Sequence, residues 1–103
     1  MTDQSLINSI VCRITEAVHP TRIYLFGSRA TSNARPDSDV DLFVIYDGPM
    51  ENREAQLEIR RALRDRDFSL DLIVTSTYKF ERYKHVVNTL AKEVNEKGIL
   101  IYG

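Results

Sequence analysis

Three aspartates of this chain have the types and spacing that favour metal chemistry. Asp39 and Asp41 are separated by one residue, and Asp71 follows in an apolar segment. Alternate residues of an extended strand share a face, so we expect Asp39 and Asp41 to point the same way with Cα atoms about 6.6 Å apart. Two carboxylates placed like this favour Mg²⁺, a hard cation that prefers oxygen ligands.

Asp71 stands between two leucines in the run FSLDLIV. Aspartate is depleted in strands. Burying its charge costs several kcal/mol unless another group compensates. A cation shared with the other two aspartates would compensate. The alternative for Asp41 and Asp71 is a buried ion pair with an arginine such as Arg22 or Arg53.

Gly27 and Ser28 follow the aromatic and β-branched residues 22–26, which predict a buried strand. Glycine lets the backbone approach a ligand closely, while Ser28 offers a hydroxyl and an N–H at a helix start, where phosphate is favoured. Arg29, and less strongly Arg35, is a candidate to neutralise phosphate charge. This pattern indicates a triphosphate seat, and the alternative is an ordinary strand-to-helix turn with a solvated Arg29.

Length and charge limit the function classes. The chain has 103 residues, which predicts one domain over residues 1–103. Its 14 basic and 15 acidic residues leave a formal net charge of -1, so we expect no direct nucleic-acid or membrane partner. No run approaches the roughly 20 apolar residues of a membrane span. The single cysteine, Cys12, is expected to be a buried thiol, and together these features predict a cytoplasmic protein.

The elements that must position these residues follow from hydrophobic periodicity. Residues 6–18 predict a helix that His19-Pro20 ends. Residues 40–45 predict a central strand covered on both faces, and a third strand is expected from residue 68. Residues 51–66 predict a second helix, and residues 77–97 have helical spacing that Gly98 ends. Residues 99–102 predict an edge strand or a docking tail. The expected fold is α/β (α+β), a small mixed sheet of three to four strands packed by helices.

Residues 24–44 resemble the signature of nucleotidyltransferases related to DNA polymerase beta, with LFGSRA at 25–30 and DSDVDL at 37–42. The resemblance extends to Asp71 by pattern and is topological elsewhere. It implies the nucleotidyltransferase fold, with ATP as substrate and Mg²⁺ as cofactor, in a two-ion arrangement. By the same resemblance Asp39, Asp41 and Asp71 are the metal-binding and catalytic residues, and Gly27, Ser28 and Arg29 bind the nucleotide. Asp71 would bridge the second ion or accept the proton of the attacking hydroxyl.

The small size resembles, more narrowly, the minimal nucleotidyltransferases, which are typically paired with an all-helical HEPN protein, commonly an RNase toxin. The resemblance implies an antitoxin that transfers AMP to a tyrosine hydroxyl of that toxin. Because positioning supplies much of the rate, we expect the partner to hold the acceptor, against apolar surface near the carboxylates or residues 99–102. Two alternatives stay open: an idle binding module that occludes its partner, and an antibiotic-type small-molecule nucleotidyltransferase with a helper subunit.

Overall fold

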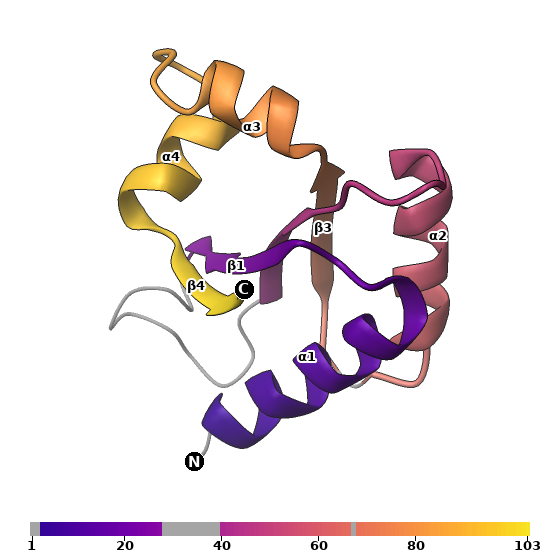
Figure 1. Cartoon of the computed structure of the whole chain (residues 1–103). Helices are drawn as coiled ribbons and strands as arrows, with labels where there is room; N and C mark the ends of the chain where they lie inside the picture. Colours follow the sequence, from indigo (N-terminus) through magenta and orange to yellow (C-terminus); the bar gives the residue numbers. More distant parts are fainter. Residues whose placement is uncertain (1–2, 28–39, 67) are drawn as a thin grey trace.

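The computed structural model describes residues 3–27, 40–66 and 68–103. These residues form four helices and four strands along the chain (Figure 1). Their order is α1 (Asp3–Val18), β1 (Arg22–Phe26), β2 (Val40–Ile45), α2 (Asn52–Ala62), β3 (Leu70–Thr75), α3 (Thr77–Tyr83), α4 (Leu90–Lys97) and β4 (Ile99–Tyr102). The expected helical turn after Gly27 and the loop before Asp39 lie outside the described residues.

The strands form one mixed sheet of four, in the order β3-β2-β1-β4. β1 pairs antiparallel with both β2 and β4, and β2 pairs parallel with β3 through the α2 crossover. The predicted α+β sheet is therefore confirmed, and so are the central position of β2 and the edge strand at residues 99–102.

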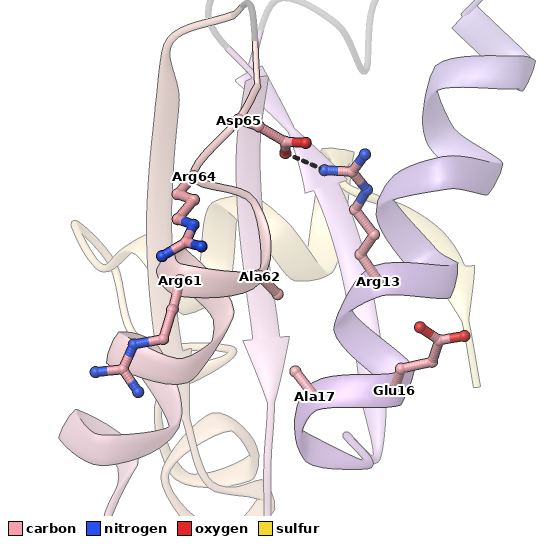
Figure 2. A pocket seen from close by; sticks show the side chains of 7 residues that line it. All are labelled: Arg13, Glu16, Ala17, Arg61, Ala62, Arg64 and Asp65. Atoms are coloured by element: carbon pink, nitrogen blue, oxygen red, sulfur yellow. Dashed lines mark hydrogen bonds and ion pairs between the residues drawn. The ribbon is translucent and has the colours of Figure 1, made fainter.

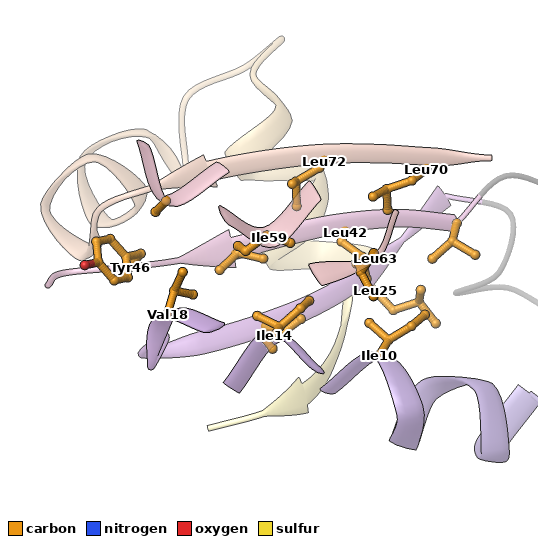
Figure 3. Close-up of a cluster of buried hydrophobic side chains, with 14 residues drawn as sticks. Ile10, Ile14, Val18, Leu25, Leu42, Tyr46, Ile59, Leu63, Leu70 and Leu72 are labelled. Atoms are coloured by element: carbon orange, nitrogen blue, oxygen red, sulfur yellow. The ribbon is translucent and has the colours of Figure 1, made fainter. Parts of the chain in front are cut away.

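Helices α1 and α2 cover one face of the sheet. Their apolar stripes and the even-numbered residues of β2 and β3 make a buried cluster, shown in Figure 3. Ile14, Leu42 and Ile59 are completely buried in it. α2 begins one residue after the predicted start because Glu51 is its N-cap, in a capping box with Glu54.

Helices α3 and α4 cover part of the opposite face (Figure 1). Phe43 and Ile45 of β2 pack there against Phe80 of α3 and Val94 of α4. The rings of Phe43 and Phe80 have centroids 5.6 Å apart. β2 is thus buried on both faces beyond its second residue, as its apolar run predicts.

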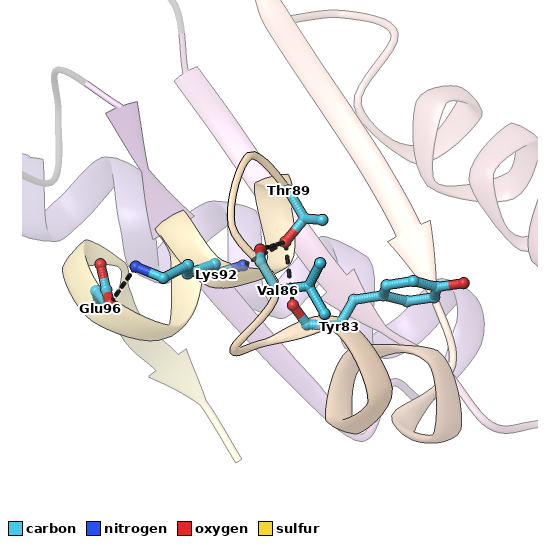
Figure 4. A network of polar contacts seen from close by, with 5 residues as sticks. All are labelled: Tyr83, Val86, Thr89, Lys92 and Glu96. Atoms are coloured by element: carbon cyan, nitrogen blue, oxygen red, sulfur yellow. Dashed lines mark hydrogen bonds and ion pairs between the residues drawn. The ribbon is translucent and has the colours of Figure 1, made fainter.

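The single helical pattern over residues 77–97 is wrong, because the structure breaks it into α3 and α4. Asn88 has a positive φ of 67°, and Thr89 is the N-cap of α4. The Thr89 hydroxyl accepts from the Lys92 N–H at 3.2 Å and lies 2.7 Å from the carbonyl oxygen of Val86 (Figure 4). This local capping ends one helix axis and starts another, which periodicity alone does not reveal.

Cys12 is exposed, so the expected buried thiol is wrong. A side chain two positions from Ile10 points about 200° around the helix, away from the buried stripe. Sγ of Cys12 instead lies 3.7 Å from a carboxylate oxygen of Glu16. In the part of the chain that the structure describes, no helix is both long and apolar enough to cross a membrane.

Asp47 connects the start of α3 to the sheet through hydrogen bonds. Its carboxylate accepts hydrogen bonds from the Thr77 N–H at 2.9 Å, from the Thr77 hydroxyl, and from the Thr21 hydroxyl at 2.9 Å. These bonds, above all the one from the Thr77 hydroxyl, hold the pKa of Asp47 below its ordinary value. The folded protein therefore favours the ionised form of this carboxylate, which binds the first residue of α3.

We expect Asp47→Ala to lower the free energy of unfolding at pH 7 by about 1 to 2 kcal/mol, because hydrogen bonds to an exposed carboxylate are lost. Since the pKa is lower in the folded protein, this contribution is present above the unfolded value of about 3.9 and disappears as the pH falls through the folded value. Urea unfolding of wild type and variant at pH 7 and at pH 3 measures both effects. An equal difference at the two pH values would contradict the assignment, and Thr77→Ala should cost less when Asp47 is already alanine.

Candidate active site

Asp41 and Asp71 are direct neighbours across the parallel strands β2 and β3. Paired residues of adjacent strands lie about 4.8 Å apart and point to the same face. Both aspartates are the second residue of their strand, so they meet at one end of the sheet. They lie on the face that α3 and α4 partly cover, because Phe43 and Ile45 follow Asp41 at alternate positions.

Gly27 lies against the Asp41 carboxylate. It directly follows β1, whose last residue, Phe26, pairs with Asp41. The φ of Gly27 is +76°, and a Cβ built on it would stand 2.0 Å from Oδ2 of Asp41. Any side chain at position 27 would therefore collide with the carboxylate while occupying a left-handed conformation. The turn after β1 brings bare backbone to the carboxylates.

Asp71 is exposed, so the expectation of a buried charge at this position is wrong. Leu70 and Leu72 point into the α1 and α2 layer, and strand alternation sends Asp71 to the other face. Within the described residues Asp71 makes no hydrogen bond or ion pair, which excludes the ion pair with Arg22 or Arg53 for this residue. Asp71 is therefore a candidate site residue because of its position beside Asp41, not because of a buried charge.

The donors fit a divalent metal ion. Two adjacent carboxylates disfavour each other's charge, and a shared cation offsets that repulsion. Mg²⁺ is commonly held by one or two carboxylates, with water and substrate phosphates filling its remaining positions. The third predicted ligand, Asp39, and the nucleotide-binding candidates Ser28 and Arg29 lie outside the described residues, as does Arg35. Among the residues that are described, no group of three or more His, Cys, Asp or Glu side chains could hold a metal.

A cleft of about 210 Å³ lies on the same face of the sheet, further along β3 from Asp71. It is lined by Phe43, Ile73, Thr75, Lys79, Phe80, Tyr83, Thr89, Leu90 and Ala91. None of these residues was predicted from the sequence to be a site residue. The available signal was the alternation of Asp71, Ile73 and Thr75, which places all three on one face of a strand.

A larger cavity of about 540 Å³ lies between α1 and α2, on the other side of the sheet (Figure 2). Arg13 pairs there with Asp65 and lowers the pKa of that carboxyl through the hydrogen bond between them. Arg61 pairs with Glu58 at 2.8 Å, and Arg64 is exposed. These side chains form a solvated groove between two helices, as the mixed charges of α2 predict. The carboxylate end of the sheet remains the candidate site.

The chain belongs to the nucleotidyltransferase family of polymerase beta, because the model of the family "Polymerase beta, Nucleotidyltransferase" matches residues 8–103. This match begins within α1 and covers all the strands that position Gly27, Asp41 and Asp71. The resemblance in the sequence motifs and the expected fold class are both confirmed. A comparison with curated proteins finds no match.

Two solved structures share this fold. A chain of a toxin-antitoxin crystallised with AMP-PNP superposes with a TM-score of 0.68 at 22% identity, over 94% of this chain and 73% of the other. A chain of the toxin-antitoxin MntA-HepT gives a TM-score of 0.64 at 20% identity, over 97% of this chain and 72% of the other. At such identities the likeness establishes the fold of the chain.

Proposed function

We propose that this chain is a Mg²⁺-dependent protein adenylyltransferase. It transfers AMP from ATP to a tyrosine hydroxyl of a cognate HEPN RNase toxin. The chain thereby acts as the antitoxin of the pair. The observation that carries the proposal is the close approach of the Gly27 backbone to the Asp41 carboxylate, with Asp71 beside Asp41 on the next strand. The toxin-antitoxin structures of the same fold, one of them crystallised with AMP-PNP, support the choice of partner and donor.

The proposed reaction assigns a role to each residue of the site. Gly27 and Ser28 would seat the triphosphate on backbone N–H groups, and Arg29 would neutralise part of its charge. Asp39 and Asp41 would hold Mg²⁺, which stabilises charge on the transferring phosphate and on the leaving pyrophosphate. The hydroxyl oxygen forms a bond to the α-phosphorus, and the bond from that phosphorus to pyrophosphate breaks. Asp71 would bridge the second ion or accept the hydroxyl proton.

The surface of the chain supports a protein acceptor. Its formal net charge of -1 supplies no general attraction to a polyanion such as RNA. Tyr78 and Val87 are each 69% exposed, on α3 and on the turn after it, on the same side of the sheet as the carboxylates. Exposed apolar surface on the side of the sheet that carries the site favours a protein partner. ATP is abundant in the cytoplasm, where we propose that the pair acts.

The decisive experiment mixes the purified chain with ATP, Mg²⁺ and the HEPN-type protein encoded beside it. Intact mass measurement should show that the partner gains one or more AMP units. Asp39→Asn combined with Asp41→Asn should add none, because the charge that holds the cation is gone. The Asp65→Asn variant is the matched control, since Asp65 lies on the other face of the sheet.

Two outcomes would contradict the proposal. If the wild type adds no mass, and if the wild type and the double Asn variant neutralise the partner equally, the chain acts by binding alone. If a small hydroxyl compound gains AMP and the partner does not, the chain is a small-molecule nucleotidyltransferase.

A further inference from the structure

We propose that the cleft between β3, α3 and α4 is the acceptor-binding site of this chain. It would receive an apolar side chain from a helix of the acceptor protein, with a carboxylate of that helix against Lys79. This inference rests on the proposed function, because it names the surface that positions the acceptor hydroxyl for the transfer.

The cleft lies on the sheet face that carries the two aspartates. Its sheet residues are Phe43 on β2 and Ile73 and Thr75 on β3, on the same face as Asp41 and Asp71. Ile73 follows Asp71 at the next position on that face, about 6.6 Å along the strand. A group held over Ile73 is therefore adjacent to the carboxylate that is proposed to meet the attacking hydroxyl.

Donor and acceptor would approach the carboxylates from different sides. The backbone turn at Gly27 adjoins Asp41 from β1, whereas the sheet part of the cleft comes from β2 and β3. In the order β3-β2-β1-β4, Gly27 reaches Asp41 from the neighbouring strand β1, whereas the cleft lies further along the two strands that carry Asp41 and Asp71. A nucleotide whose phosphates sit at Gly27 leaves the β3 side open to the second substrate. β4, the other surface considered for the partner, lies at the opposite edge of the sheet from Asp71.

The size of the cleft selects the kind of occupant. Its volume of about 210 Å³ is below the roughly 300–1,000 Å³ of pockets that hold cofactor-sized ligands. The cleft thus suits one or two side chains rather than a nucleotide. Its walls are mostly apolar, and Ile73 and Tyr83 at its mouth are each 41% exposed. An amphipathic helix that inserts an apolar anchor matches this combination.

The charge of Lys79 in the cleft favours a carboxylate next to the apolar anchor of the partner helix. Lys84 and Lys92 are paired with Glu81 and Glu96. Lys79, which lines the cleft, makes no side-chain hydrogen bond or ion pair among the described residues. An exposed, unpaired ammonium group beside an apolar cleft favours a partner carboxylate at that point. The other nearby cation, Arg82, bonds to the Tyr78 hydroxyl at 3.2 Å.

The test compares two cleft variants with two matched controls. Ile73→Gln removes an exposed aliphatic side chain from the cleft, and Leu57→Gln removes one from α2 on the other face. Lys79→Glu reverses a charge in the first turn of α3, and Arg53→Glu reverses one in the first turn of α2. Three quantities are measured for each: the affinity for the HEPN-type protein without nucleotide, kcat/KM of AMP transfer to it, and the rise in melting temperature with Mg²⁺ and ATP.

We expect each cleft variant to lose at least about tenfold in partner affinity and in kcat/KM, as side chains central to an interface do. Their response to Mg²⁺ and ATP should equal that of the wild type, and both controls should stay within about twofold of it in every measurement. Melting curves without ligand show that each variant is folded.

Three other outcomes separate the possible failures. Cleft variants that bind and transfer like the wild type would overturn the cleft assignment and leave the proposed function standing. Cleft variants that lose the response to Mg²⁺ and ATP would assign the cleft to the nucleotide, which also overturns it. If the wild type binds the partner but transfers nothing, the proposed function fails, and a loss of affinity in the cleft variants still supports the cleft as the docking site.

Discussion

Asp41→Asn is expected to reduce AMP transfer at least about 1000-fold while the protein stays folded. The substitution keeps the size and hydrogen-bonding shape of the side chain and removes the charge that would hold the cation between Asp41 and Asp71. A metal ion contributes several kcal/mol to the stabilisation of a phosphoryl transition state, and about 4 kcal/mol corresponds to this loss. Single-turnover assays with the HEPN-type partner measure the rate.

Ligand binding provides an independent readout of the same variant. Mg²⁺ with ATP should raise the melting temperature of the wild type by mass action, and this rise should vanish in Asp41→Asn. The control Asp65→Asn removes an exposed carboxylate from the groove between α1 and α2 and should keep both the rate and the rise. Transfer by Asp41→Asn within tenfold of the wild type would show that Asp41 is not a metal ligand.

Gly27→Ala should reduce transfer by at least about 100-fold, and it should also destabilise the fold. The new Cβ would meet Oδ2 of Asp41 at 2.0 Å, so the carboxylate must leave its position. Misplacement of a reacting group by about 1 Å costs on the order of 100-fold in rate. The φ of +76° adds about 1 to 2 kcal/mol of strain for any residue with a side chain. Chemical unfolding and transfer assays measure the two effects separately.

A double-mutant cycle isolates the clash from the strain. When Asp41 is already alanine, Gly27→Ala keeps the strained φ but loses the collision, so it should cost less free energy of unfolding than in the wild type. Equal costs in the two backgrounds would mean that Gly27 and Asp41 are not in contact. Normal transfer by Gly27→Ala would show that the close approach of the backbone is not needed for the reaction.

The strands and the first two helices could be predicted because their signals are local. Residues 22–26 and 40–45 became β1 and β2 at the predicted bounds, since each is a short apolar run ended by turn residues. The helical spacing of residues 77–97 did not predict two helices. Asn88 has a positive φ, and Thr89 then caps a new helix by accepting from the Lys92 N–H. The spacing of apolar residues indicates the buried face of both helices, but it does not show where one helix ends and the next begins.

Two side chains show where local reasoning about burial was wrong. Cys12 lies in an apolar helical segment, yet it points to solvent because the buried stripe of α1 runs through Ile10 and Ile14. Asp71 lies between buried leucines, yet it is exposed because the two faces of β3 are covered to different extents. Which face of an element becomes buried depends on its neighbours in space, and the spacing of residues along the chain does not specify them.

The sequence by itself determined the chemical groups of the candidate site and the family: the carboxylates, the glycine turn and the strands that carry them follow from residue types and short spacings. The tertiary structure decided how these groups meet. The parallel pairing of β2 and β3 puts Asp41 beside Asp71, and the antiparallel pairing of β1 brings Gly27 against Asp41. It also packed α3 and α4 over the sheet face that carries Asp71, and so formed the cleft. Strand register and helix packing arise from contacts between residues far apart in the chain, so they become fixed only when the whole core assembles.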